Sequence, residues 1–214
     1  MARIVIIGGT GYSGSHILRA AVERGHEVVS LSRALPQEPV DGASYEIGSI
    51  ADAADRARAL RDADAVVVAI SPRGDMMGRV RPAIAALAAD AAEAGVRIGV
   101  IGGAGSALVA EGGPQLKDTP EFPKAILPES IELGEVLDDL RAAPEPLDWF
   151  LVSPAAVYGS HVSVPPRGEY RTGGDVLVVD TEGRSELSGD DLGLAVIDEI
   201  ETPRHRRARF TLGY

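Results

Sequence analysis

The chain begins with a short apolar segment that runs straight into a glycine-rich turn. Residues 4–7 read Ile-Val-Ile-Ile, and Gly8, Gly11 and Gly14 follow at intervals of three. Gly8 permits a tight turn, Gly11 removes a side chain that would keep a ligand from the backbone, and Gly14 lets the next helix pack closely on the strand. A helix that begins here directs free amide groups and the positive end of its dipole at the turn. This arrangement is typical of a site for the diphosphate of a dinucleotide.

The neighbouring residues complete the strand-helix-strand unit that such a motif needs. A helical pattern covers residues 13–24, Gly25 is expected to end the helix, and a second buried strand is predicted at 26–32. Without this context the glycines would indicate only an ordinary turn. We therefore predict that the chain binds a nicotinamide dinucleotide.

Short apolar segments and helical patterns alternate along the rest of the chain, as in parallel sheets that helices cover on both faces. We predict an α/β fold, a Rossmann-like doubly wound parallel sheet with the glycine-rich strand central, formed by a single domain over residues 1–214. Residues 154–188 are expected to form a small C-terminal appendage, an insertion on the substrate side. The predicted strands are 3–7, 27–32, 44–47, 65–70, 97–101 and 148–153, with a hairpin strand at 176–180 and a terminal strand; the further helices are 51–61, 80–94, 129–142 and 190–200.

Charge and composition exclude several classes of function. The 214 residues carry a formal net charge of −11, which argues against binding to nucleic acid or to an anionic membrane. The one basic cluster, residues 204–209, is interpreted as a solvated turn before the last strand. Cysteine is absent and the four histidines are scattered, so no metal site is expected. The first apolar stretch is too short for a signal or membrane segment, and a cytoplasmic protein is predicted.

The end of the second strand indicates which dinucleotide is preferred. An NAD-specific site usually presents an acidic residue to the ribose 2′-hydroxyl at this point, whereas this chain has Arg33, nineteen residues after Gly14. A guanidinium suits a 2′-phosphate because its donors form a planar fork. A solvated surface arginine is the alternative interpretation. We predict that NADP(H) is preferred over NAD(H).

The residues expected to contact the cofactor lie at the carboxyl ends of the predicted strands, where open α/β sheets bind their ligands. The loops 71–78, 102–122 and 153–170 should surround the nicotinamide, with Met76, Met77, Phe122 and Tyr158 able to line a flat pocket. The cofactor-binding candidates are Gly8, Thr10, Gly11, Tyr12, Ser13, Gly14, Ser32, Arg33, Ser49, Ile50, Ala69, Ile70, Ser71, Gly102, Gly103, Ser153, Pro154 and Ala155.

The sequence contains no obvious proton donor. Short-chain reductases commonly use a tyrosine four residues before a lysine, but Gly113 and Pro120 stand four residues before the only lysines. The catalytic candidates are Ser106, Ser153 and Tyr158, each of which could equally be a turn-stabilising hydroxyl or a packed ring. Asp190 and Asp191 are interpreted as part of a helix start that Ser188 caps.

Together these features resemble the atypical short-chain dehydrogenase/reductase superfamily, in its NAD(P)H-binding group of NmrA-like proteins and the biliverdin reductase B or flavin reductase type. The resemblance spans nearly the whole chain, although only its first motif is specific to a ligand. The flavin reductases carry a serine at the end of the fifth strand, where this chain has Gly102 and Gly103. The motifs are 8–14, 31–33, 64–68, 102–106, 148–156, 168–172 and 187–192.

The resemblance implies an NADPH-dependent oxidoreductase that transfers hydride to a small planar acceptor, such as a flavin, a quinone or a similar carbonyl compound. Because the hydride chemistry belongs to the cofactor, the proton can come from water. A non-catalytic NADP(H)-sensing regulatory protein of the NmrA-like type is the alternative. An epimerase acting on a nucleotide sugar is a weaker one, because the tyrosine-lysine pair is missing. A small-molecule substrate and a monomer or homodimer are expected.

Overall fold

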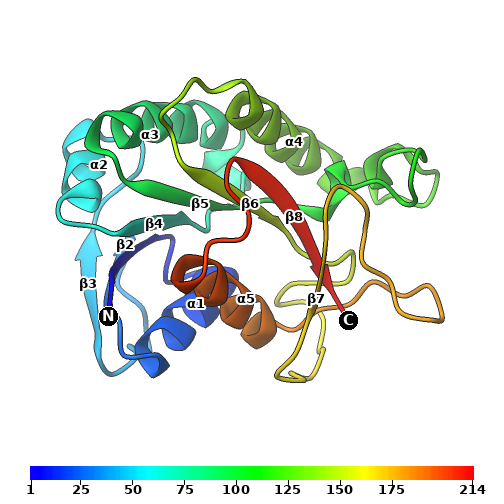
Figure 1. Cartoon of the computed structure of the whole chain (residues 1–214), viewed down its shortest axis with the longest axis horizontal. Helices are drawn as coiled ribbons and strands as arrows, with labels where there is room; N and C mark the ends of the chain where they lie inside the picture. The colour runs from blue at the N-terminus through cyan, green and yellow to red at the C-terminus, as the bar shows by residue number, and fades with distance from the viewer.

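A computed structural model describes residues 1–214 and contains one sheet of eight strands (Figure 1). The strands lie in the order β3-β2-β1-β4-β5-β6-β8-β7, and every neighbouring pair is parallel except β7 with β8. The predicted doubly wound Rossmann-like sheet is confirmed, because the glycine-rich strand β1 stands between the two halves. The strands are β1 (Arg3–Ile7), β2 (Glu27–Ser32), β3 (Ala43–Ile47), β4 (Ala65–Val68), β5 (Arg97–Ile101), β6 (Trp149–Ser153), β7 (Arg171–Gly173) and β8 (Ala208–Gly213).

Helices cover both faces of this sheet (Figure 1). One face carries α2 (Ala53–Leu60), α3 (Val80–Ala94) and α4 (Leu127–Ala142), and the other carries α1 (Tyr12–Glu23) and α5 (Gly189–Glu201). The packing of β1 explains why its sequence is continuously apolar. Val5 and Ile7 pack with the first group of helices, while Ile4 and Ile6 pack with the second. Both faces of the central strands are buried, as expected for parallel sheets.

The C-terminal part of the chain differs from the prediction in one strand. The hairpin strand expected at 176–180 is wrong, because the antiparallel edge strand is β7, at Arg171–Gly173. The later segment bonds elsewhere: the amide of Leu177 donates to the carbonyl of Leu108 at 2.9 Å, and Thr211 Oγ1 donates to the carbonyl of Val176 at 2.6 Å. Residues 176–177 therefore brace the long loop after β5 rather than extending the sheet.

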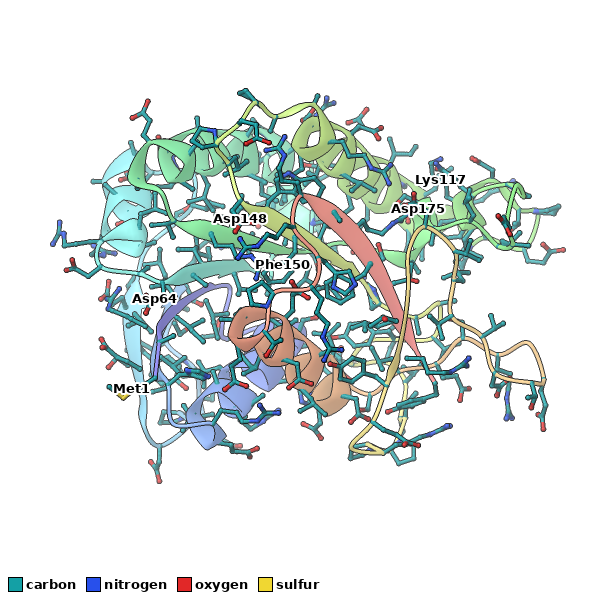
Figure 2. The ribbon with its side chains drawn as sticks, viewed as in Figure 1. Met1, Asp64, Lys117, Asp148, Phe150 and Asp175 are labelled. Carbon is teal, nitrogen blue, oxygen red and sulfur yellow. The ribbon has the colours of Figure 1, made fainter.

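The basic cluster before β8 is less exposed than a solvated turn would be. The Arg209 side chain is 2% exposed and its Nε donates to Asp175 at 2.7 Å (Asp175 is labelled in Figure 2). The interpretation of residues 204–209 as a solvated turn is therefore wrong for Arg209, although the terminal strand it belongs to is present. Such a buried guanidinium needs a paired acid because an unpaired buried charge is costly.

Asp191, in the first turn of α5, has a structural role beyond helix capping. Ser188 is the N-cap and accepts a hydrogen bond from the amide of Asp191, as predicted. The Asp191 side chain is buried, however, and it accepts bonds from the amides of Arg167 and Gly168. This carboxylate thereby fixes the segment that leads into β7.

A buried ionic network closes the amino end of the sheet, away from the glycine turn. Glu199 accepts hydrogen bonds from Arg97 Nη2 at 2.7 Å and from the amide of His205 at 2.9 Å. Arg97 also lies over the ring of Phe150, 4.7 Å from its centre, and Figure 2 shows Phe150 between the sheet and α5. Burial disfavours the charged carboxylate, but these hydrogen bonds outweigh it, so the pKa of Glu199 lies below its usual value.

Candidate functional site

The turn between β1 and α1 is built by close backbone contacts that only glycine allows. Gly8 has φ +89°, and a Cβ atom there would lie 2.7 Å from the carbonyl oxygen of Ala69 on the loop after β4. A Cβ atom on Gly14 would overlap the carbonyl of Gly8 and lie 2.8 Å from the Cα of Gly9. Larger residues would push the helix away from the strand.

The first turn of α1 leaves a set of amide donors free. Gly11 is the N-cap and offers no side chain, no acidic residue stands in the first turn, and the first helical bond runs from the Ser15 amide to the Gly11 carbonyl. The amides of Tyr12, Ser13 and Gly14 make no hydrogen bond within the protein. Free donors at the positive end of a helix dipole fit a phosphate group. These residues therefore suit the diphosphate of a dinucleotide.

Arg33 follows β2 at one end of the site, and the structure gives it an acidic partner. Its guanidinium forms an ion pair with Asp75, which lies on a short 3-10 turn (Gly74–Met76) after β4. Both side chains are more than half exposed, at 57% and 68%. An exposed pair of this kind is weak, so Arg33 is available to a stronger anion.

A single cavity of about 920 Å³ extends from this end across the carboxyl ends of the strands. That volume lies near the upper limit for small-molecule sites. All the cofactor-binding candidates line it except Gly14, which lies behind the turn, and Ser153, which is fully buried.

Long loops and the start of α4 form the other end of this cavity, which we call the acceptor end because the sequence predicts the substrate there. Its walls come from the loop after β5, from α4, and from the loop after β6. Of the side chains expected to line a flat pocket, Met76, Phe122 and Tyr158 do so and Met77 does not. Other lining residues at this end are apolar, namely Ile101, Leu116, Ile126 and Leu133, or polar, namely Thr119, Glu121, Glu129, Ser130, Ser160 and His161.

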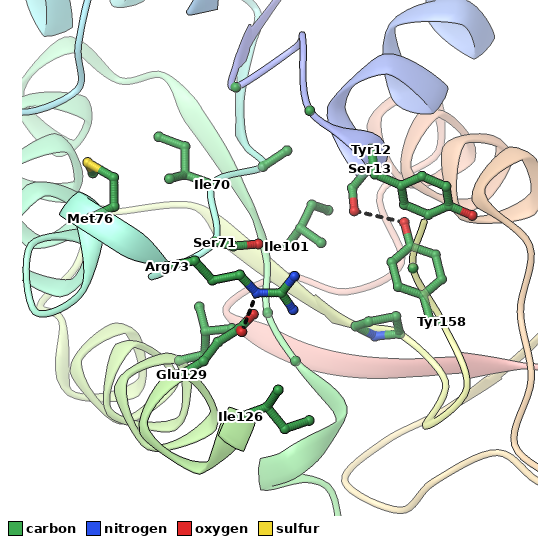
Figure 3. A pocket seen from close by; sticks show the side chains of 18 of the residues that line it. Tyr12, Ser13, Ile70, Ser71, Arg73, Met76, Ile101, Ile126, Glu129 and Tyr158 are labelled. Carbon is green, nitrogen blue, oxygen red and sulfur yellow. Dashed lines mark hydrogen bonds and ion pairs between the residues drawn. The ribbon is translucent and has the colours of Figure 1, made fainter. Parts of the chain in front are cut away.

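Two of the three catalytic candidates are brought together, but outside the main cavity: Arg209 Nη1 donates to Ser106 Oγ at 3.3 Å and to Ser153 Oγ at 3.5 Å. Ser106 lines a separate hollow beside Arg141 and Asp175, and Ser153 is fully buried. Tyr158 lines the main cavity, where its hydroxyl donates to Ser13 Oγ at 2.8 Å (Figure 3). Burial raises the pKa of Tyr158 well above its usual value, although the bond to Ser13 acts in the opposite direction. A phenol in this state is a weak acid.

One functional candidate escaped the sequence reasoning. Arg73, on the loop after β4, lines the cavity and its Nε donates to Glu129 on α4 at 2.5 Å (Figure 3). The two residues stand 56 positions apart, so no local pattern could have paired them. The arginine adds a positive charge to a wall that contains apolar, hydroxyl and acidic side chains.

Two further properties bear on the possible chemistry. No group of three or more histidine, cysteine, aspartate or glutamate side chains is arranged to hold a metal ion. Each helix is too short or too polar to cross a membrane.

Comparison with known proteins agrees with the geometry of the turn. The profile of a family described as NAD(P)H-binding matches residues 8–203. YwnB of Bacillus subtilis strain 168 is 35% identical over 215 residues, which cover 98% of this chain and 97% of YwnB. A solved structure from Burkholderia pseudomallei, of a candidate exported protein, is 35% identical with a TM-score of 0.88 and covers 100% of both chains. SP1627 of Streptococcus pneumoniae TIGR4, a candidate NADH-flavin reductase, is 28% identical with a TM-score of 0.85, covering 100% of this chain and 99% of SP1627. The chain belongs to the NAD(P)H-binding family, in agreement with the NAD(P)H-binding group that its motifs predicted.

Proposed function

We propose that this protein is an NADPH-dependent reductase of small planar acceptors, such as flavins, quinones or similar carbonyl compounds. The observation that carries the proposal is the continuity of the cavity: the glycine turn and the acceptor end line one space. A dinucleotide whose diphosphate lies on the turn would extend toward the carboxyl ends of β4, β5 and β6, where the acceptor end begins.

The reaction needs no acidic side chain from the protein. When bound, NADPH would supply the hydride and water would supply the proton, so that NADP⁺ and the reduced acceptor would be the products. The chain holds the two reactants together and limits the access of water. This role matches the absence of a tyrosine-lysine pair and the engagement of the Tyr158 hydroxyl with Ser13.

The preference for NADPH rests on Arg33. A 2′-phosphate carries more charge than the Asp75 carboxylate and accepts bonds from the planar fork of the guanidinium. Asp75 remains nearby and repels that phosphate, so the preference should be moderate.

The test is the oxidation of NADPH, followed by its absorbance, with a panel of flavins, quinones and aromatic aldehydes. Turnover with planar acceptors, at lower KM for NADPH than for NADH, is the expected result. Tight binding of NADPH without oxidation by any acceptor would contradict the reductase and favour the NADP(H)-sensing alternative.

A further inference from the structure

Arg73 reaches into the cavity with most of its hydrogen-bonding capacity unused. Its Nε donates to Glu129, whereas Nη1 and Nη2 donate to no protein atom. Figure 3 shows the guanidinium directed into the pocket between Ser71 and Glu129. The Arg73 side chain is 64% exposed, while that of Glu129 is 14% exposed. The free edge of the guanidinium can therefore bind a carboxylate or phosphate through two parallel hydrogen bonds.

The segment that carries Arg73 is held in place on both sides. The amide of Arg73 donates to the carbonyl of Ser71 at 2.9 Å, and its own carbonyl accepts from the amide of Met76 at 3.0 Å. Farther along, the amides of Gly78 and Arg81 donate to the buried side chain of Glu132 on α4, at 2.7 and 3.0 Å. Arg73 is thus presented from an anchored loop, and less backbone freedom is lost when a ligand binds.

The positions of the basic side chains along the cavity indicate that the free edge of the Arg73 guanidinium lies at the acceptor end. The basic side chains that line the cavity are Arg33, Arg73 and His161. Arg33 forms its ion pair with Asp75 at the end near β2, whereas Arg73 contacts Glu129 at the start of α4. The lining at this end combines apolar side chains, such as Ile101 and Ile126, with two acidic ones, Glu121 and Glu129. Glu129 is already bonded to Arg73, so the free edge of the guanidinium can add specificity through a few well-placed bonds.

We propose that Arg73 binds an anionic group of the acceptor, so that the preferred substrates are flat, apolar molecules that carry a carboxylate or a phosphate. The inference rests on the proposed reductase function and names the substrate class of that same site. Glu129 acts as a positioning residue because it holds the Nε edge and leaves the other edge toward the cavity.

Matched pairs of acceptors test this proposal directly. Methyl 4-formylbenzoate and 4-formylbenzoate differ by one carboxylate, and riboflavin and FMN differ by one phosphate. We expect Arg73→Gln to lower the ratio of kcat/KM for the anionic member over the neutral member by roughly ten- to a hundredfold, the range for a charged hydrogen bond. Arg79→Gln is the matched control, since Arg79 is an exposed arginine six positions along that makes no side-chain hydrogen bond and does not line the cavity.

The Kd of NADPH separates acceptor recognition from cofactor recognition. Arg73→Gln should change this Kd by less than about twofold. The loss of a charged hydrogen bond to the cofactor would instead raise it by roughly ten- to a hundredfold. An unchanged acceptor ratio would overturn the proposal. A loss of NADPH affinity as large as the loss for the anionic acceptor would also overturn it, because the arginine would then bind the cofactor.

Binding measurements keep the inference testable if no acceptor is reduced. Quenching of flavin fluorescence in the presence of NADP⁺ gives the Kd of FMN and of riboflavin without turnover. Tighter binding of FMN in the wild type, lost in Arg73→Gln, would support the anionic ligand class while the reductase function fails. Equal binding of the two flavins by the wild type would overturn the inference.

Discussion

The two ends of the sheet treat polar groups in opposite ways. At the amino end, Glu199 and Arg97 are buried and bonded to one another and to backbone atoms. At the carboxyl end, the amides of residues 12–14 and the outer edge of Arg73 have no protein partner. Since burying an unpaired charge is costly, the fold depends on each partner of the first arrangement being present. The second leaves donors ready for a ligand, which is where binding and chemistry are expected.

The largest predicted effect is a loss of fold stability without a change in cofactor binding. Glu199→Gln removes the nearer of two acidic partners from the buried guanidinium of Arg97 and leaves only the ion pair with Asp148 at 3.5 Å. We expect the free energy of unfolding to fall by about 3 kcal/mol, the lower end of the range for a broken buried pair. The Kd of NADPH should remain unchanged because the network lies at the opposite end of the sheet. Denaturant unfolding and a cofactor titration measure the two quantities. Glu23→Gln, an exposed glutamate without an ion pair, is the control.

The same carboxylate gives the wild type a defined dependence on pH. Because the pKa of Glu199 is lowered in the folded protein from 4.5, its contribution is complete above that pH and is lost as the pH falls through the lower folded value. Glu199→Gln should lack this acid-dependent component. An identical acid profile for the two proteins would contradict the role of the network.

The next effect should fall on cofactor binding. In Gly14→Ala the new methyl group overlaps the Gly8 carbonyl, so the helix that presents the free amides must move. Forced overpacking costs about 1–3 kcal/mol or more, and we expect NADPH affinity to fall by about a hundredfold. Gly174→Ala has open space around its Cβ and serves as control. An unaltered Kd in Gly14→Ala would show that the diphosphate does not lie on this turn.

A smaller effect concerns the choice between the two dinucleotides. Arg33→Ala should weaken NADPH by about tenfold, the lower end of the range for a charged bond, because the pair with Asp75 is exposed to solvent. The affinity for NADH should change little. Asp75→Asn should act in the opposite direction, since it removes a negative charge beside the phosphate. Equal affinity of the wild type for NADPH and NADH would contradict the role assigned to Arg33.

The smallest effect is expected at the tyrosines. Tyr158→Phe removes a hydroxyl that is bonded to Ser13, and Tyr170→Phe removes one that is bonded to Asp198 outside the cavity. Each rate should fall far less than the roughly 10²–10⁴-fold that the loss of a general acid causes. A loss of that size at Tyr158, with cofactor affinity intact, would identify it as the proton donor.

The contrast between the two ends also explains what the sequence could and could not predict. The glycine turn is local, so its spacing identifies the strand, the helix start and the ligand class together. The partners of Arg33 and Arg73 stand 42 and 56 positions away, and only the packing of loops after β2 and β4 against one another and α4 brings them close. The prediction of a strand at 176–180 was wrong for the same reason: long-range contacts decide the structure there. Leu108 and Thr211, which form hydrogen bonds with that segment, lie in distant parts of the chain.

One measurement tests the central claim most directly: the rate of NADPH oxidation with a planar acceptor, compared between ordinary NADPH and NADPH deuterated at the transferred position of C4. We expect oxidation of NADPH in step with reduction of the acceptor, with a slower rate for the deuterated cofactor in single turnovers. Tight cofactor binding with no oxidation by any flavin, quinone or aldehyde would contradict the account.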